Sequence, residues 1–588
     1  MKDEKVIEQI KDLKNRFKDS VKISEYVEFN MSETLNRIHA TMNDKFISGE
    51  YDALGRKKPY FNISNAAANV WYRATDIDRK DIKIIAEHKT EYINALLATH
   101  HLRKYMRKSS FGLFLNNWGL TLARYGSAVV KILDDNNEFL SFRVVPWSSI
   151  IVDPIDFNAS PQVEIFYMTK EQLKKEAKAR GYDLNVINNL QDGSTRKDLK
   201  DKEKSDKKGF YRLYETHGVF DGKQMMYVFV EDGGEFKLIF KAEEKFNPYQ
   251  ITHLIPEDGR TLSKGAIERL FEPQWGVNYS MKQIKDQLDL ANKIIFQTAD
   301  SNLFGRNVLT NIETGDIILH APNMPITQLN NSTHDIGANN SWTATWKSLR
   351  DELAHISEAM LGKMPKSGTP WRSTEAILQE SYSLFDIMIE QKGLYIEEWL
   401  RKFVIPHIKK NHLNNSKEIA VVLDDHDLQR IDKAFIKRQA ISYYNSKVAK
   451  AIITDDFTDV PQSPQEAEMQ IEKMYKEANT GNIRYFIPDD KNSQKTWAEQ
   501  FKNMEWELEI DISGEQRNRS EVLSTLNTTL QVIANPNFAQ NKYAQKIVAK
   551  ILETTGAMSS LELQSLDTLA DATIDNQNKI QDNVDVIS

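Results

Sequence analysis

The stretch GKMPKSGTPWRST, residues 362–374, combines the glycine, lysine and hydroxyl residues that bind phosphate in nucleotide-binding loops. Such a loop places its glycines first, then Lys and Ser or Thr at the start of a helix, after a buried strand. Here Gly362 and Lys363 come first, and no lysine separates Gly368 from Thr369. The segment before the stretch carries apolar residues at helical spacing, which are Leu349, Leu353, Ile356 and Met360. We interpret the stretch as a basic loop between two helices rather than as a nucleotide site.

A second candidate is the acidic cluster LDDHD, which follows the short strand-like segment EIAVVL and contains Asp424, Asp425 and Asp427. Nucleases of the two-metal type carry carboxylates at strand ends, but they need further carboxylates from other elements. A strand-end turn with Asp427 as the N-cap of the next helix is the simpler interpretation. The segment VDPID, with Asp153 and Asp156, is likewise interpreted as a turn.

Other catalytic patterns do not stand out. The chain has twelve histidines and no cysteine, so thiol chemistry and Cys-ligated metals are excluded. His407 and His412 are five residues apart, which is not the spacing of two ligands on one helix face, and no H-E-x-x-H occurs. We therefore predict no catalytic residues, no metal and no cofactor, and a structural or assembly protein rather than an enzyme.

The composition fits this expectation. The 588 residues carry a formal net charge of −7, so no overall basic field indicates tight nucleic-acid binding. The N-terminal segment is charged and lacks the apolar core of a signal peptide. No run approaches the ~18 apolar residues that span a bilayer. We expect a soluble, non-secreted protein that does not interact with membranes.

The N-terminal half of the chain is predicted to contain both helices and strands. Val6, Ile10, Leu13 and Phe17 predict a first helix, and Ile82, Ile85, Tyr92 and Leu96 predict a further one. Residues 126–255 alternate as strands do, with turn signals at Asp221-Gly222 and Gly233-Gly234. A helix is predicted at TKEQLKKEAKARG within this β-rich region.

The C-terminal half is predicted to be mainly helical. Met281, Ile284, Leu288, Ala291 and Ile295 form the stripe of a helix over about 264–300. A long stripe from Leu378 to Phe403 contains Gly393, which either a kink or the close approach of another helix would explain. The alternating segment EWELEIDISG predicts a strand with one buried face. Three further helices are expected over about 517–534, 539–554 and 559–581.

The order of the predicted elements, and two segments within it, resemble the portal protein of tailed bacteriophages, the head-to-tail connector. The two segments are THLIPEDGRTLSKGAIERLFEPQWGVNYSMKQIKDQL (252–288) and LAHISEAMLGKMPKSGTPWRSTEAILQESYSLFDIMIEQ (353–391), and VVPWSSIIVDP (144–154) is similar to the β-rich part of that family. The resemblance covers residues 60–450 by element order. It implies an α+β, portal-type subunit with an α/β wing, a two-helix stem, a clip, a long kinked helix with a tunnel loop, and a helical crown.

The resemblance also implies a domain map. It places N-terminal helices and the β-rich wing in 1–262 and a helical crown in 462–588. Between them it implies a stem helix (263–300), a clip (301–344), a second stem helix (345–361), a tunnel loop (362–374) and a long wing helix followed by a short strand and helix (375–461).

By the same resemblance, the chain would form a ring, usually of twelve subunits, at one capsid vertex of the virion after assembly in the host cytoplasm. The ring would be the channel for DNA packaging and ejection, and double-stranded phage DNA would pass through it without sequence-specific binding. The implied protein partners are the terminase large subunit, which is the packaging motor, and the major capsid, scaffold and neck or tail adaptor proteins. The implied DNA-channel loop contains Lys363, Lys366, Ser367, Gly368 and Arg372.

Two alternatives from other classes stay open. A terminase-like nuclease and ATPase would use Asp424 and Asp427, and it would need a phosphate-binding loop that the chain lacks. A DNA-independent intracellular helical scaffold would assemble without a channel.

Overall fold

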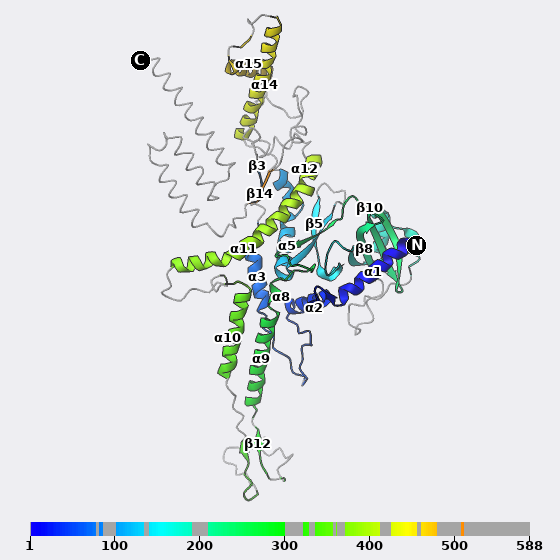
Figure 1. Ribbon diagram of the computed structural model, residues 1–588, viewed down its shortest axis with the longest axis vertical. Coiled ribbons are helices and arrows are strands. Elements are labelled where there is room, and N and C mark those ends of the chain that lie inside the picture. Colours follow the sequence, from blue (N-terminus) through cyan, green and yellow to red (C-terminus); the bar gives the residue numbers. More distant parts are fainter. Residues whose placement is uncertain are drawn as a thin grey trace. The chain divides into compact units, whose positions relative to one another are not determined.

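The computed structural model divides the chain into two compact units, which are described separately here. The first contains Met1–Thr75, Asn116–Lys131 and Arg143–Gln391, and the second contains Asp76–Leu115, Ile132–Phe142 and Lys392–Ser588. The structure describes residues 2–53, 55–77, 82–85, 101–133, 140–190, 210–293, 295–299, 301, 321–328, 336–356, 360, 371–411, 425–454, 460–461, 463–478 and 507–510. Its described part is a mixed helix and sheet protein, as the sequence predicted, and its strand pairs are antiparallel (Figure 1).

The first unit begins with helix α1 (Lys2–Lys18), and the predicted stripe is confirmed as its buried face. Val6, Ile10 and Leu13 are buried, and they pack with Tyr214 and Phe229 of the neighbouring sheet. Helix α2 (Met31–Met42) follows, with the side chain of Asn30 accepting a hydrogen bond from Glu33 N as its N-cap.

The sheet beneath α1 has five antiparallel strands in the order β10-β9-β8-β7-β6. The predicted turns at Asp221-Gly222 and Gly233-Gly234 join its last three strands, and all four turn residues have positive φ. Two-residue hairpin loops of this kind need positive φ at both positions, which Gly and Asp tolerate. The strands are β6 (Ile150–Ile151), β7 (Gln162–Thr169), β8 (Phe210–Phe220), β9 (Lys223–Asp232) and β10 (Glu235–Glu243).

Helix α6 (Lys170–Arg180) confirms the helix predicted within the β-rich region. Thr169 and Gln172 form a reciprocal capping box at its start, and Gly181 ends it with φ of 80°. Its Leu173 and Ala177 are buried in a cluster with Val228 and with short helix α7 (Leu184–Asn188).

A three-stranded sheet, in the order β11-β4-β5, completes the β-rich region. Its strands are β4 (Ser127–Leu133), β5 (Ser141–Val145) and β11 (Tyr249–His253). Helix α5 (Phe111–Tyr125) is followed by Gly126, where φ is 79°. A Cβ on Gly126 would lie 2.5 Å from Ser263 O, and one on Gly265 would lie 2.5 Å from Arg124 O, so two glycines allow two backbones to cross.

After short helix α8 (Ala266–Arg269), the chain leaves the sheets as helix α9 (Phe271–Ala291) and returns as helix α10 (Ile336–Leu353). Figure 1 shows the two helices side by side, with β12 (Phe296–Gln297) beyond their ends, where it pairs with β13 (Thr327–Gln328). A Cβ on Gly276, in the first half of α9, would clash with the ring of Trp346, in the second half of α10. The pair is therefore antiparallel, and Gly276 permits its close contact.

The limits of these helices differ from the prediction. The first ends at Ala291 rather than near residue 300, because Phe296 and Gln297 pair as a strand. The second begins at Ile336 rather than at residue 345 and ends at Leu353. Asn339 and Asn340 favour irregular structure locally, but they lie in a helix whose Trp346 packs against α9. Tertiary packing outweighs weak propensity here.

In the second unit, the helix predicted around Ile82 and Ile85 is wrong. Ile82–Ile85 form strand β3, which pairs with β14 (Glu507–Ile510). The predicted strand at EWELEIDISG is thereby confirmed over Glu507–Ile510. The spacing of three between the two isoleucines suits a helix, but the partner that makes this segment a strand comes from the other end of the chain.

Long helix α11 (Trp371–Trp399) belongs to the first unit up to Gln391 and to the second unit from Lys392. It starts four residues before the predicted limit at 375. It continues through Gly393 without interruption, and the irregularity comes later, as the π-helical turn η6 (Leu400–Val404) before α12 (Ile405–Asn411). Helix α14 (Asp425–Thr454) lies where a helix was expected in the last part of residues 375–461. It packs against α15 (Pro464–Ala478) through Ile436, Ala440, Ala467 and Ile471. The three helices expected beyond residue 517 lie outside the described residues.

Candidate functional site

Most of the predicted DNA-channel loop lies outside the described residues, including Lys363, Lys366, Ser367 and Gly368. Arg372 is described only as part of the backbone of α11. The expected loop limit at Thr374 is therefore too late, since the helix begins at Trp371. Pro370 precedes that start in sequence, and proline is tolerated at the first turn of a helix but not in its interior.

The two helices that flank this loop in sequence meet at Trp71 of helix α3 (Ser64–Ala74). The fully buried Trp71 donates its Nε1 hydrogen to Ala354 O at 2.9 Å, just after α10. Its ring makes an edge contact with Phe385 of α11, with centroids 6.3 Å apart. Trp71 thus fixes the end of one flanking helix and the side of the other.

Helix α10 ends in a Schellman motif at this point. Ile356 N donates to Asp351 O, and His355 N donates to Glu352 O, while His355 has φ of 54°. Glycine is the residue that usually occupies this left-handed position, because it has no Cβ. The chain therefore stops the helix sharply with a strained non-glycine residue before the predicted loop.

Helix α9 also supplies the N-terminal cap of α3. The residue before α3, Ile63, has no side-chain cap of its own. Gln274 Oε1 instead accepts hydrogen bonds from Ile63 N and Ser64 N at 2.9 and 3.1 Å, and Asn278 Oδ1 accepts from Phe61 N. These buried contacts tie the outgoing helix of the α9–α10 pair firmly to α3.

The α9–α10 pair carries large apolar side chains that the described part of the chain leaves exposed. Trp275 and Tyr279 stack with their centroids 5.2 Å apart and are 58% and 47% exposed, and Trp342 is 53% exposed. Along the pair, Leu288, Leu290, Leu349 and Leu353 are exposed as well. The predicted stripe on α9 is thus only half covered, with Met281 and Ile284 partly buried and Leu288 exposed.

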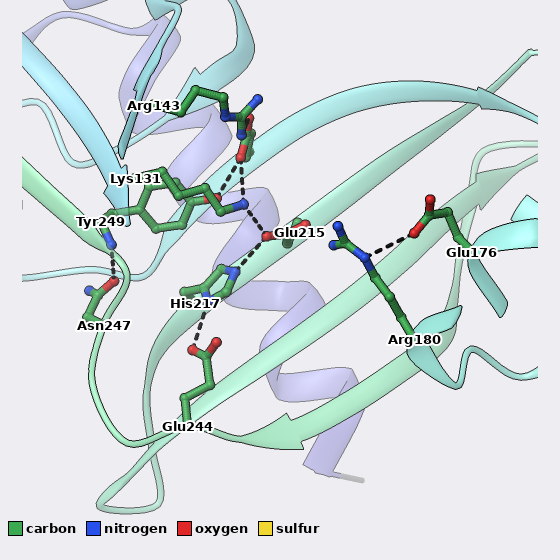
Figure 2. Close-up of polar contacts among 10 residues, drawn as sticks. Lys131, Arg143, Glu176, Arg180, Glu215, His217, Glu244, Asn247 and Tyr249 are labelled. Atoms are coloured by element: carbon green, nitrogen blue, oxygen red, sulfur yellow. Dashed lines mark hydrogen bonds and ion pairs between the residues drawn. The ribbon is translucent and has the colours of Figure 1, made fainter. Parts of the chain in front are cut away.

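A buried chain of alternating charges joins the two sheets of the first unit (Figure 2). Arg143 bonds Glu164 at 2.6 Å, and Glu164 bonds Lys131 at 2.9 Å. Lys131 bonds Glu215, which accepts from His217 Nε2 at 2.9 Å. The chain continues on the other side of the imidazole, where His217 Nδ1 donates to Glu244 Oε2 at 2.7 Å, and Tyr249 OH donates to Glu164 at 2.8 Å.

The environment sets the protonation of this chain. Burial alone would lower the pKa of His217, but its hydrogen bonds with Glu215 and Glu244 raise it above 6.5. Burial alone would raise the pKa of Glu215, but the hydrogen bond from His217 and the charge of Lys131 lower it to about 2. Carboxylates only accept hydrogen bonds, so an imidazole between two of them carries both protons. Three cationic side chains then face three anionic ones, so this row of charged side chains is neutral as a whole.

We assign this charged chain to structure, because each of its ions is bonded to an opposite ion. Arg143 and Glu244 lie nearest the surface, while the members between them are almost fully buried. Sequence reasoning did not single it out. The available signal was a charged residue at an apolar strand position, as in SAVVKIL for Lys131, YETHG for Glu215 and QVEIF for Glu164.

A second buried charge that the sequence did not indicate is Lys392 in α11. Burial lowers its pKa to about 8, while the charge of Asp76 opposes that shift. Lysines with a lowered pKa can act as bases, but a lowered pKa alone does not indicate a reaction.

The acidic segments VDPID and LDDHD, which the sequence offered as candidate sites, correspond to a turn and to the start of a helix. Asp153 Oδ1 accepts from Ile155 N and Asp156 N, which confirms the predicted turn, and Arg16 pairs with it at 2.7 Å. Helix α14 already begins at Asp425, so Asp427 lies within its first turn and is not the N-cap. Asp424 and His412 lie outside the described residues, and His407 makes an edge contact with Tyr105. Within the described ranges, no group of three or more His, Asp or Glu side chains could hold a metal ion.

None of the helices in the described part of the chain is long and apolar enough to cross a membrane. No protein-family model matches the chain, and no curated protein matches it either.

Proposed function

We propose that this chain is a portal-type subunit that closes into a ring at one capsid vertex and forms the channel through which DNA is packaged and ejected. The observation that carries the proposal is the excursion made by α9, β12, β13 and α10. It leaves the sheets as one helix, turns back through a short strand pair and returns as an antiparallel helix. That order corresponds to the stem and clip that the sequence resemblance implies.

The exposed side chains on the same helix pair favour a neighbouring subunit. Trp275, Tyr279 and Trp342 are aromatic residues of the kind that anchor protein interfaces, and exposed leucines extend the apolar area along both helices. In a heterologous ring, one surface of each subunit contacts a different surface of the next, and closure covers both. The helix pair offers exposed apolar side chains for such a contact.

The loop between α10 and α11 is the proposed DNA-facing element. Its cations are Lys363 and Lys366, with Arg372 following at the start of α11, in a chain whose formal net charge is −7. Affinity for DNA rises with the number of phosphates that a protein neutralises, so many strongly basic subunits would hold DNA tightly. A few cations per subunit permit weak, sequence-independent contacts that let DNA slide.

The remaining assignments follow from the same proposal. The chain would be a virion component rather than an enzyme, and it would use no cofactor. Its partners would be double-stranded phage DNA, the terminase large subunit, and the capsid, scaffold and neck or tail proteins.

Native mass spectrometry of assembled protein tests the subunit contact. We expect a single large closed species for the natural sequence. Replacing Trp275 and Trp342 together by Ser should strongly reduce it at equal concentration, because interface aromatics often contribute 2 kcal/mol or more each, about a thirtyfold effect. The matched control is Tyr26→Ser, which removes an aromatic residue that is 89% exposed outside the helix pair. Equal assembly of the double variant and the control would contradict the proposed interface.

A further inference from the structure

A pocket of about 330 Å³ lies in the first unit between α1, α2 and the five-stranded sheet. Its volume is at the small end of the range in which proteins bind compact ligands. Side chains from several elements line the pocket. Helices α1 and α2 contribute on one side, and the short 3-10 helix η3 (Trp147–Ser149) with strands β6, β7 and β8 contributes on the other. Its members are therefore fixed by packed secondary structure.

Three cationic side chains reach this pocket from two directions. Lys14 and Lys18 come from α1, and Arg212 comes from β8. Among the described residues that line the pocket, none is acidic. Like charges that converge without lining anions create a local positive potential that attracts an anion.

Two of these cations, Arg212 and Lys14, also make contacts within the chain. Arg212 Nε donates to Tyr167 OH at 3.0 Å, and its NH1 lies 3.9 Å from Glu231. The Lys14 ammonium lies 5.7 Å from the centre of the Tyr214 ring. A guanidinium has five N–H donors and an ammonium has three, so both groups can bond more than one acceptor at a time.

The floor of the pocket is apolar. Leu35, Ile150 and Ile151 are buried there, and Phe17 and Ile165 are partly buried. Lys18 and Ser148 are exposed and lie at the rim. A bare phosphate would satisfy the cations but leave the partly exposed Phe17 and Ile165 in contact with water, whereas an apolar side chain would cover them.

We propose that this pocket binds an acidic segment of a partner protein, which places one apolar side chain on the floor and its flanking carboxylates beside Lys14, Lys18 and Arg212. The pocket lies within one chain, so this inference does not depend on ring formation or on DNA.

Fluorescence anisotropy with the full chain tests the proposal. The probes are labelled peptides in which a single Phe, Tyr, Trp, Leu or Ile is flanked on both sides by Asp or Glu, together with counterparts in which Asn or Gln replaces the acids. We expect several acidic peptides to bind, their neutral counterparts to bind much more weakly, and affinity to fall with added salt.

Two kinds of variant distinguish this pocket from other basic surfaces. Replacing Lys14 and Lys18 by Gln should weaken binding by about two- to fivefold each, the size expected for rim charge pairs. Ser148→Trp should block the floor without removing charge. Lys5→Gln is the matched control, because Lys5 is an exposed lysine on the same helix but does not line the pocket.

Several outcomes would overturn the inference. Binding that survives Ser148→Trp and the lysine variants would place the peptide elsewhere. Failure of every acidic peptide to bind, or equal binding of the neutral counterparts, would exclude an acidic apolar segment. Displacement of the peptides by inorganic phosphate or by a short DNA duplex at equal charge concentration would show that the pocket selects phosphate instead.

Discussion

His217 shows how single residues stabilise the first unit. Its imidazole lies between two carboxylates, and both of them stabilise the protonated, positively charged form. A buried charged chain of this kind is stabilising only while every member keeps its partner, because an unpaired buried ion is strongly destabilising. The protonated His217 therefore supports Glu215, whose other partner, Lys131, lies in the three-stranded sheet.

The first prediction concerns the pH dependence of stability. The raised pKa of His217 contributes stability that is fully present below 6.5, its unfolded value, and is lost as pH rises through the higher folded value. The lowered pKa of Glu215 contributes stability above 4.5 that is lost as pH falls toward about 2. Urea unfolding of the first unit should therefore give maximal stability between pH 4.5 and 6.5 from this pair.

The variant His217→Gln separates this contribution from the rest of the chain. It should be less stable at pH 6 and should lose the decline on the alkaline side, because Gln does not titrate. An alkaline decline as steep in the variant as in the natural sequence would show that other groups cause it.

At the scale of elements, the end of α10 gives the second prediction. His355 occupies a left-handed position that costs a residue with a Cβ about 1 kcal/mol or more. His355→Gly should raise the free energy of unfolding by about 0.5–1 kcal/mol, part of the gain being lost to glycine's greater freedom in the unfolded chain. His355→Ala is the control, since it removes the imidazole but keeps the Cβ, and it should give no gain in the same urea titration.

The third prediction tests the contact between α9 and α10. A Cβ at position 276 would meet the Trp346 ring, so Gly276→Ala should destabilise the pair by about 1–3 kcal/mol, the usual effect of overpacking. Trp346→Ala should be destabilising by about 3–5 kcal/mol through the cavity that it leaves. The double variant should cost clearly less than the sum of the two, because the clash disappears with the ring. Strict additivity in a double-mutant cycle would mean that the two residues do not touch.

The elements themselves were predictable wherever local chemistry decides them. Positive-φ turns at Asp221-Gly222 and Gly233-Gly234, the capping box at Thr169 and the stripe of α1 are all readable from neighbouring residues. Strand β3 was not, because β14 lies far away in sequence. The charged chain was not either, because a strand pattern does not reveal which charge on one sheet faces which charge on another.

At the scale of the whole molecule, the proposed DNA loop gives the fourth prediction. Replacing Lys363 and Lys366 of the loop and Arg372 in the first turn of α11 together by Gln should leave assembly unchanged, since loops and the helix ends beside them contribute little to packed interfaces. DNA packaging or retention should decrease and become less sensitive to salt, because three phosphate contacts per subunit are lost. Packaging assays over a salt series measure both effects.

Two results would contradict this assignment of the loop. Saturable ATP binding that disappears in the triple variant would indicate a nucleotide site. Failure of the variant to assemble would place the loop in a subunit interface.

The central claim is that copies of this chain close into a ring around a channel, and electron microscopy of negatively stained, assembled protein tests it most directly. The account predicts end-on views of one closed ring with an axial hole wide enough for a DNA duplex. Particles that stay monomeric under all assembly conditions, form open filaments or lack an axial hole would contradict it.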